Sequence, residues 1–390
     1  MSLFDWVELF MLFWLLDLDE FMINMRSRYK LFSVVLLSAV QVAGVIAAGL
    51  FSPVNASITP TLAHKSTKQN QLAQDFAEPL REGNRLFDLG KYGEAIKAYT
   101  LVIDDFRQTS EIRIQAQLQR SRAYILAAVF GSTGYDNYDQ AIGAAIADCS
   151  RVINVAPENS AGYVCRGFAY SYIFSHKEAF ADFNRAIELA PNNPYVYFSR
   201  GEAYSRSDQF DSAIADFSQA IKLDPKFAEA YYFRGLMYTD KKPADAQRAN
   251  TDFSQAIQID STQVRYYGAR GASRYSTGEY QGAVSDYTQV IQRSPSATAY
   301  VDRGSALAAL GKDAEAMADY NQAILLVPEH IMAYYGRGLL LAKRGDTKGA
   351  MSDLQQARRL YQELMGKENF HQPEYQKIIK AIEQLQVNRP

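Results

Sequence analysis

The chain has little of the residue types from which most enzyme and metal sites are built. Its 390 residues include two cysteines and four scattered histidines, His64, His176, His330 and His371. No Cys-x-x-Cys pair occurs, and no glycines follow the Gly-x-Gly-x-x-Gly spacing that cradles a phosphate. The sequence therefore predicts no metal, no cofactor and no catalytic residues, and it argues against an enzyme.

A large excess of charge of one sign is also lacking. Residues 1–56 contain five acidic and three basic residues, so the rest of the chain carries 38 of each. Proteins that bind nucleic acid need a basic surface to neutralise phosphates. We therefore expect no nucleic-acid partner.

One long uncharged run is present near the N-terminus. Arg26, Arg28 and Lys30 precede residues 31–51, which carry no charge, and Ala56 follows soon after. A basic region, an apolar core and small residues resemble a secretory signal cleaved after Ala56. The run is also long enough to stay uncleaved as a membrane anchor. Both alternatives for residues 25–56 place the rest of the protein outside the cytoplasm, in the periplasm or an equivalent space, with membrane contact only through this segment.

The segments on either side of this run are less regular. Residues 1–24 are aromatic, apolar and acidic, which signal sequences usually are not at their start. Either Met25 is the true start, or residues 1–24 form a short interfacial segment. Residues 57–75 are rich in Ser, Thr, Lys, Gln and Asn and predict a polar linker.

A repeat of about 34 residues occupies most of what remains. Six Arg-Gly pairs recur at spacings of 34, 34, 36, 33 and 34 residues. Such a period indicates that each unit is one supersecondary element stacked on its neighbours, and that function resides on an extended surface. The pairs are Arg166-Gly167, Arg200-Gly201, Arg234-Gly235, Arg270-Gly271, Arg303-Gly304 and Arg337-Gly338.

Each unit reads as two helices. In the unit around Arg200, Tyr197 lies three residues earlier, on the same helical face. Glycine inside a helix is unfavourable by about 1 kcal/mol, so Gly201 indicates a close approach by a second helix. Ala213 and Phe217 follow in that second helix, and Pro225 ends it. Helix, turn, helix and stop are thus predicted in each unit.

These residues resemble the tetratricopeptide repeat, with Arg standing where that family has Leu. The resemblance covers residues 76–366 as eight units and implies an all-α, right-handed α-solenoid. Residues 367–390 place Tyr375, Ile378 and Ile382 on one face, which predicts a C-terminal capping helix.

An Asp follows the Arg of each pair by sixteen residues, or by eighteen where two residues are inserted. The constant register predicts a partly buried ion pair in each unit that joins its two helices. A basic ligand-binding stripe is the rival interpretation, but the matched acids would neutralise it. The predicted pairs are Arg166 with Asp182, Arg200 with Asp216, Arg234 with Asp252, Arg270 with Asp286, Arg303 with Asp319, and Arg337 with Asp353.

The resemblance also implies a concave groove lined by the first helices, rich in aromatic residues that suit protein binding. The alternative is that about half of these rings only pack between neighbouring helices. The groove residues that the resemblance implies are Phe168, Tyr172, Tyr195, Phe198, Glu202, Arg206, Tyr232, Tyr275 and Tyr335.

Cys149 and Cys165 lie on helices that stacking makes neighbours. They form either a disulfide or two small buried thiols. Taken together, the sequence predicts an exported, non-enzymatic scaffold that binds protein or peptide partners, for instance in assembly of a membrane or envelope complex. The alternatives are an accessory subunit of an envelope enzyme or secretion machine, and a glycan-binding module.

Overall fold

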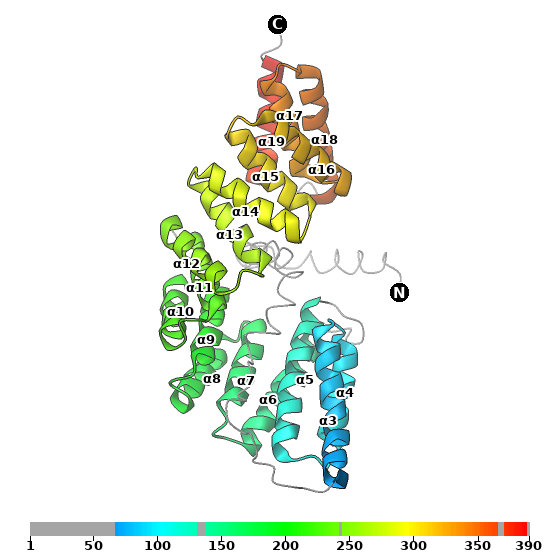
Figure 1. Ribbon diagram of the computed structural model, residues 1–390, viewed down its shortest axis with the longest axis vertical. Coiled ribbons are helices and arrows are strands. Elements are labelled where there is room, and N and C mark those ends of the chain that lie inside the picture. The colour runs from blue at the N-terminus through cyan, green and yellow to red at the C-terminus, as the bar shows by residue number, and fades with distance from the viewer. Residues whose placement is uncertain (1–66, 131–137, 242–243, 366–369, 388–390) are drawn as a thin grey trace, which may run out of the picture. The chain divides into compact units, whose positions relative to one another are not determined.

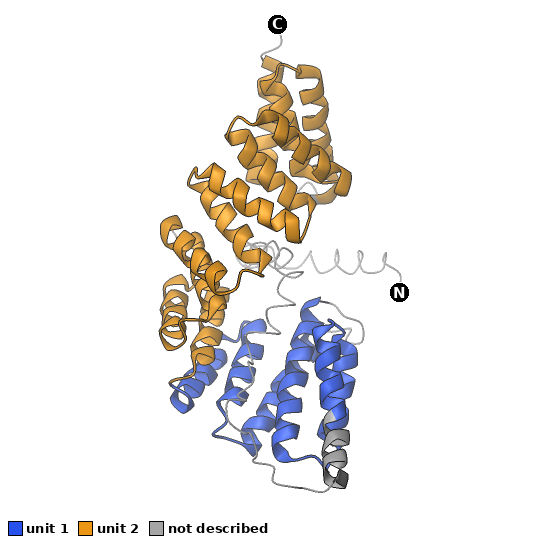
Figure 2. Ribbon diagram, viewed as in Figure 1, with its two compact units in different colours: residues 1–191 blue, residues 192–390 orange. Residues whose placement is uncertain are grey.

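The computed structural model describes residues 67–130, 138–241, 244–365 and 370–387. Within these ranges every regular element is a helix, and seventeen helices follow one another (Figure 1). The predicted all-α repeat fold is confirmed. The proposed signal or anchor and the segment 1–24 lie outside the described residues. The chain divides into two compact units, residues 1–191 and 192–390 (Figure 2).

The described residues of unit 1 form three helix pairs, in which each helix packs against the next along the chain. The first described helix begins at Thr67, so residues 67–75, which we assigned to a linker, are helical. The six helices are α3 (Thr67–Asp88), α4 (Tyr92–Asp104), α5 (Ser110–Phe130), α6 (Tyr138–Val155), α7 (Ser160–Tyr172) and α8 (His176–Leu189).

Unit 2 holds five further pairs and a final single helix, which together with unit 1 makes eight pairs in the described residues. The first helices of successive pairs also contact one another. The paired helices are α9 (Pro194–Arg206), α10 (Phe210–Leu223), α11 (Ala228–Asp240), α12 (Ala246–Ile259), α13 (Val264–Ser276), α14 (Tyr280–Arg293), α15 (Ala297–Ala309), α16 (Asp313–Leu326), α17 (Ile331–Lys343) and α18 (Thr347–Met365); the single helix is α19 (Pro373–Val387).

Local signals set the helix ends. The Asn193 side chain accepts a hydrogen bond from the backbone N–H of Tyr195, and Pro194 occupies the first helical position of α9. Both features favour a helix start. The Asn side chain accepts from a backbone N–H that has no partner within the helix, and Pro has no backbone N–H that would need one. α10 ends at Leu223, two residues before Pro225, as the pattern predicts.

In four of the six Arg-Gly pairs, those at Gly201, Gly235, Gly271 and Gly304, the glycine makes room for an aromatic ring. A Cβ atom on Gly235 would lie 2.6 Å from the ring of Phe253, and one on Gly201 would lie 2.8 Å from the ring of Phe217. Both rings are fully buried. The close approach is therefore chiefly to the large residue of the second helix, and less to its backbone.

Helix α19 covers the last pair. Tyr375, Ile378 and Ile382 are buried, and Tyr375 packs on Tyr361 of α18 with ring centroids 5.1 Å apart. A repeat stack needs such a helix because its last apolar face would otherwise meet water.

The turns inside the pairs differ in their strain. Gly278, Gly311 and Gly345 take positive φ values where a first helix turns into a second. At the matching place before α8 stands Phe174, with φ of 57° and a side chain that is 47% exposed. A bulky residue in this conformation is unfavourable.

Candidate functional site

Each of the six predicted Arg and Asp residues contacts its expected partner. Nε and Nη2 of the arginine donate to the two carboxylate oxygens of the aspartate at 2.7–3.0 Å, the two-pronged arrangement that makes arginine pairs strong. The aspartates are almost fully buried, while the arginines remain 16–25% exposed. Each pair joins the first helix of a repeat to its second.

In five of these arginines the third nitrogen reaches the preceding repeat. Nη1 of Arg270 donates to the Ser254 hydroxyl of α12 at 3.0 Å, and Nη1 of Arg337 donates to the Asn321 side chain of α16 at 2.7 Å. Arg166, Arg234 and Arg303 make the same contact to Ser150, Ser218 and Thr288. The guanidinium groups therefore connect successive repeats and are already engaged, which argues against an open basic stripe.

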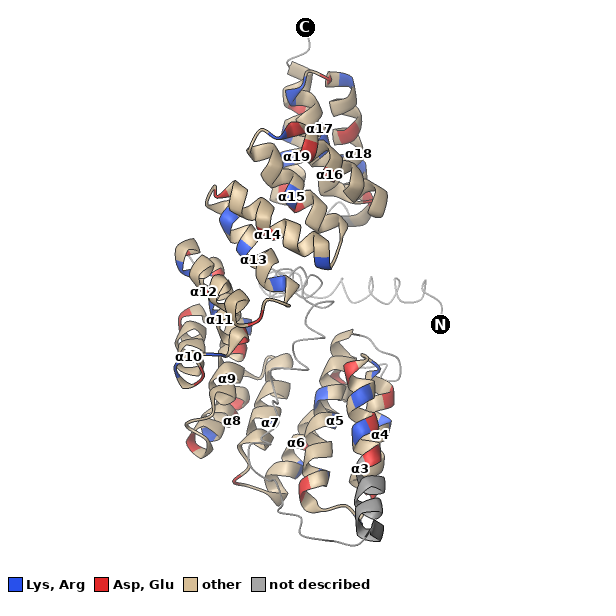
Figure 3. Cartoon of the chain, in the orientation of Figure 1, with Lys and Arg blue, Asp and Glu red and all other residues tan. Residues whose placement is uncertain are grey.

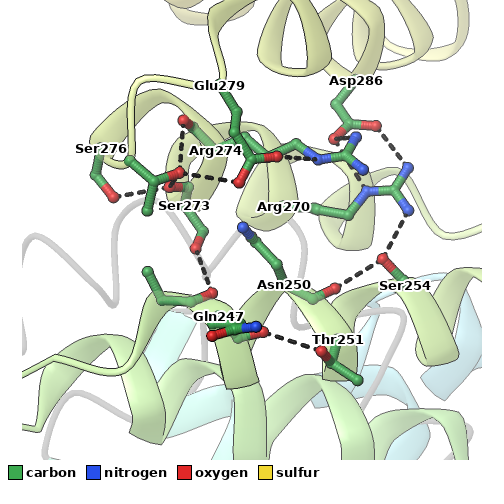
Figure 4. Close-up of polar contacts among 12 residues, drawn as sticks. Gln247, Asn250, Thr251, Ser254, Arg270, Ser273, Arg274, Ser276, Glu279 and Asp286 are labelled. Carbon is green, nitrogen blue, oxygen red and sulfur yellow. Dashed lines mark hydrogen bonds and ion pairs between the residues drawn. The ribbon is translucent and has the colours of Figure 1, made fainter.

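Figure 4 shows the most connected of these sites. Asp286 accepts from Arg270 and also from Nη1 of Arg274, at 2.8 Å. The side chain of Asp286 is 2% exposed. Two cations therefore surround one buried carboxylate, and Ser254 links the group to α12.

A seventh pair was missed by sequence reasoning. Arg120 of α5 donates to both oxygens of Asp148 on α6 at 2.7 and 2.8 Å, and its Nη1 reaches Thr100 of α4. The separation is 28 residues because of the insertion between the two helices. The signal was Arg120-Ser121, in which a small serine takes the place of glycine.

The predicted groove residues divide into two groups. Phe168, Phe198 and Glu202 are buried, so the prediction that they contact a partner directly is wrong for these three. Phe198 packs on Phe227 instead, with ring centroids 4.9 Å apart. The other six remain wholly or partly exposed on the first helices: Tyr172, Tyr195, Arg206, Tyr232, Tyr275 and Tyr335.

Tyr232 is covered by a side chain of the protein itself. The guanidinium of Arg265 lies 5.2 Å from the ring centroid of Tyr232 and 5.0 Å from that of Tyr266. Its Nη2 is 3.6 Å from a carboxylate oxygen of Glu229. Arg265 is 7% exposed. Two rings and a carboxylate thus enclose a cation, as cation–π geometry favours.

Burial raises the pKa of two acidic side chains on first helices. Burial raises the pKa of Glu202 to about 7, although Arg206 lies 3.7 Å away and partly opposes the shift. Burial raises the pKa of Asp302, on α15, to about 6. Both shifts have the sign expected when a carboxylate leaves water. Sequence reasoning missed Asp302.

Two other kinds of site were considered, a polar pocket and a metal site. A polar pocket of about 530 Å³ lies beside α11 and α12, and its lining includes the ion pair of Arg234 with Asp252. In the described parts of the chain, no three His, Cys, Asp or Glu residues gather as a metal site would require. Basic and acidic residues are interspersed along the helices of each unit (Figure 3).

The cysteines of unit 1 are bonded to each other. A disulfide joins Cys149 of α6 to Cys165 of α7, with Cα atoms 5.7 Å apart. Of the two alternatives left open by the sequence, the structure contains the bridge. Cys149 is fully buried, and the bond connects two neighbouring repeats.

Three family models of the tetratricopeptide repeat match the chain, at residues 194–227, 304–345 and 331–372. These segments are similar to tetratricopeptide repeats. The first coincides with α9 and α10, and the other two run from α15 into the turn after α18. No match was found among curated proteins.

Several solved tetratricopeptide structures are similar. The Cut9–Hcn1 hetero-tetramer of the APC/C is 12% identical, with 83% of this chain and 60% of that chain covered and a TM-score of 0.52. YrrB, described as a TPR protein with an unusual peptide-binding site, is 21% identical over 52% of this chain and 97% of its own, with a TM-score of 0.43. A tetratricopeptide repeat protein from Parabacteroides merdae is 17% identical over 69% and 98%, with a TM-score of 0.46. At such identities the likeness concerns the fold alone.

Proposed function

We propose that this protein is a non-enzymatic scaffold that binds partner proteins or peptides through the exposed tyrosines of its first helices. The observation that carries the proposal is the set Tyr195, Tyr275 and Tyr335 in unit 2, which keep accessible surface on three first helices. Tyrosine offers a large contact area with little loss of side-chain entropy, and it is enriched at binding hot spots.

The repeating charged residues support a scaffold over a catalyst. The arginines and aspartates that recur in every strong repeat bind one another and the neighbouring repeat, so they serve packing. What varies between repeats is the surface of the first helices, and variation on a constant frame suits recognition of a particular partner.

The proposal includes export. Arg26, Arg28 and Lys30 before the uncharged residues 31–51 support a signal or an anchor. The disulfide of unit 1 agrees with this, because such bonds persist in oxidising compartments. Among the described helices, none has the length and apolarity needed to cross a membrane. Cell fractionation with N-terminal sequencing tests the idea: cleavage gives a protein that starts at Ser57, and full-length protein in the cytosol contradicts export.

Partner capture tests the binding surface. The full chain is cross-linked to its partners in the native membrane fraction, and the Tyr195→Ala, Tyr275→Ala and Tyr335→Ala changes are combined in one variant. Leu325→Ala is the matched control, since this side chain on second helix α16 is 74% exposed. Loss of the same cross-linked protein in the triple variant alone supports the proposal, whereas its retention excludes this surface.

A second candidate function has an observation in its favour. Leu325, Leu326 and Val327 at the end of α16 are 74, 46 and 40% exposed, and three adjacent apolar side chains on a second helix suit a contact away from the first helices. The chain would then be an accessory subunit of an envelope enzyme or a secretion machine. In the same experiment, this candidate predicts that Leu325→Ala loses the partner and the tyrosine variant keeps it.

A further inference from the structure

The fifth repeat differs from the other strong repeats in the turn between its two helices. α11 ends at Asp240 and α12 begins at Ala246, so five residues separate them, whereas three residues separate the paired helices of the other strong repeats. Insertions in repeat proteins map to loops on one face, and that face is often the one that binds. The polar pocket of about 530 Å³ adjoins this longer turn, since Tyr238 and Asp245 on its two sides both line the pocket. Small-molecule sites have volumes of about 300 to 1,000 Å³.

The residues beside the turn are held in place by contacts with one another. The backbone N–H of Asp245 donates to the carbonyl oxygen of Tyr238 at 2.8 Å, which closes the turn. The Asp245 carboxylate accepts from the backbone N–H of Arg248 at 3.1 Å, and its other oxygen lies 3.2 Å from Nε of that arginine. The Arg248 guanidinium lies 5.7 Å from the ring centroid of Tyr238. This side of the pocket is therefore preformed, which lowers the entropy cost of binding.

The charges that line the pocket are already balanced. Two arginines and two aspartates belong to the lining. Arg234 is bound to Asp252, and Arg248 is paired with Asp245. An ionic ligand would have to replace a partner that is already in place, and the pocket has no net charge to attract it. A neutral ligand is therefore favoured over an ion.

Several polar groups remain for such a ligand. The Arg248 side chain is 69% exposed, and Asp245 engages its Nε, which leaves its two terminal nitrogens as donors. Gln247 is exposed, and its amide can both donate and accept. The Thr251 hydroxyl donates to the Gln247 carbonyl oxygen at 3.0 Å (Figure 4), so its own oxygen can still accept. Donors and acceptors both line the pocket, and a molecule with several hydroxyl groups can use both.

Tyr238 adds a partly buried aromatic ring to this polar lining. Such a side chain has an apolar body and a polar tip. A sugar ring has an apolar C–H face and an edge of hydroxyls, so both parts find a complement here. We propose that the pocket between α11 and α12 binds a sugar of one or two rings. This site goes beyond the proposed scaffold function and shares no residue with the exposed tyrosines of the first helices.

The test is an array of neutral and N-acetylated oligosaccharides probed with the full chain, followed by isothermal titration with the disaccharide that binds best. The variant with Gln247→Ala and Arg248→Ala combined should raise the dissociation constant at least about tenfold, which corresponds to 1.4 kcal/mol. Both side chains are exposed, so the variant should unfold at the wild-type temperature.

The control combines Gln281→Ala with Arg185→Ala and should bind the disaccharide like the wild type. Gln281 occupies the second position of α14, as Gln247 does in α12, and it does not line the pocket. Arg185 of α8 is also exposed and forms an ion pair with Glu188, three residues away, much as Arg248 does with Asp245.

Three outcomes overturn the inference. No oligosaccharide binds, or the pocket variant binds as well as the wild type, or the control variant loses binding to the same extent. Binding of inorganic phosphate instead of sugars, lost in the pocket variant, assigns the pocket to anions and also overturns it. Each of these outcomes leaves the scaffold function standing, because that function is tested by partner capture through the tyrosines.

Discussion

Asp286 accepts hydrogen bonds from both prongs of Arg270, at 2.7 and 3.0 Å, from a position where its side chain is 2% exposed. Arg274 adds a third hydrogen bond to the same carboxylate. Because the remaining nitrogen of Arg270 binds Ser254, one buried acid holds together α12, α13 and α14. The pair thus fixes the fold within a repeat and the position of that repeat on its neighbour.

Asp286→Ala should strongly destabilise unit 2. The change leaves two partly buried guanidinium groups without their acceptor, and we expect a loss of about 3 to 5 kcal/mol. Asp319→Ala removes the acceptor of one arginine and should have a smaller effect. Urea unfolding combined with hydrogen exchange measures both, since repeats open locally. An equal or larger loss for Asp319→Ala contradicts the double role of Asp286.

Gly235→Ala should destabilise the fifth repeat through a clash. The added methyl would lie 2.6 Å from the ring of Phe253, and overpacking of this kind lowers stability by about 1 to 3 kcal/mol. Gly143 of α6 is the matched control, because nothing lies within 4 Å of its missing Cβ. Gly143→Ala should raise stability by up to about 1 kcal/mol through helix propensity. Thermal midpoints that shift in the same direction for both variants would rule out the steric explanation.

Phe174→Gly should stabilise unit 1. The φ of 57° at Phe174 is unfavourable for a bulky side chain but accessible to glycine, and relief of this strain is worth about 1 kcal/mol. Gly278→Ala, at φ of 82°, provides the reverse experiment and should destabilise unit 2. The midpoint of thermal unfolding distinguishes them. A lower midpoint for Phe174→Gly would mean that its contact with the His176 ring outweighs the strain.

Asp302 should make stability depend on pH. Its pKa is about 6 in the folded chain and 3.8 without burial, so the folded state holds its proton more tightly. The wild type therefore loses stability as pH rises from about 4 to 6, by about 1 to 3 kcal/mol, and the loss remains above that range. Asp302→Asn should remove this dependence and be the more stable protein at pH 7.

Unfolding titrations at pH 4, 6 and 8 measure the effect. The difference between Asp302→Asn and the wild type should be small at pH 4 and largest at pH 8. Glu329→Gln, which changes an exposed acid, should follow the wild type at every pH. If the free energies of unfolding of Asp302→Asn and the wild type differ by the same amount at every pH, burial does not disfavour the ionised form of Asp302.

The period of the Arg-Gly pairs identifies much of the fold because each unit repeats its contacts locally. The sixteen residues from Arg303 to Asp319 correspond to the second half of a first helix, one turn and the first half of a second helix, so the register carries over to each complete unit. Arg120 and Asp148 escape the pattern since an insertion separates them by 28 residues. In that repeat, the contact between Arg120 and Asp148 depends on how α5 packs against α6.

The exposure of a side chain was harder to infer from the sequence than the position of a helix. Tyr195 and Phe198 lie on the same first helix, and we assigned both to a groove. Phe198 is nevertheless buried against Phe227, which directly precedes α11. Likewise, the ring of Tyr232 is covered by Arg265, which is distant in sequence. Helical periodicity indicates a direction for a side chain, but the neighbouring repeat determines what covers it.

The sequence by itself determined the helix pairs, their number and the pairing of each strong arginine with its aspartate, because these depend on spacing within one repeat. Tertiary structure alone decided which first-helix aromatics stay accessible, whether the two cysteines are joined, and that burial raises the pKa of Asp302. Those properties arise where one repeat packs on another, and there the side chains of both together set burial and charge.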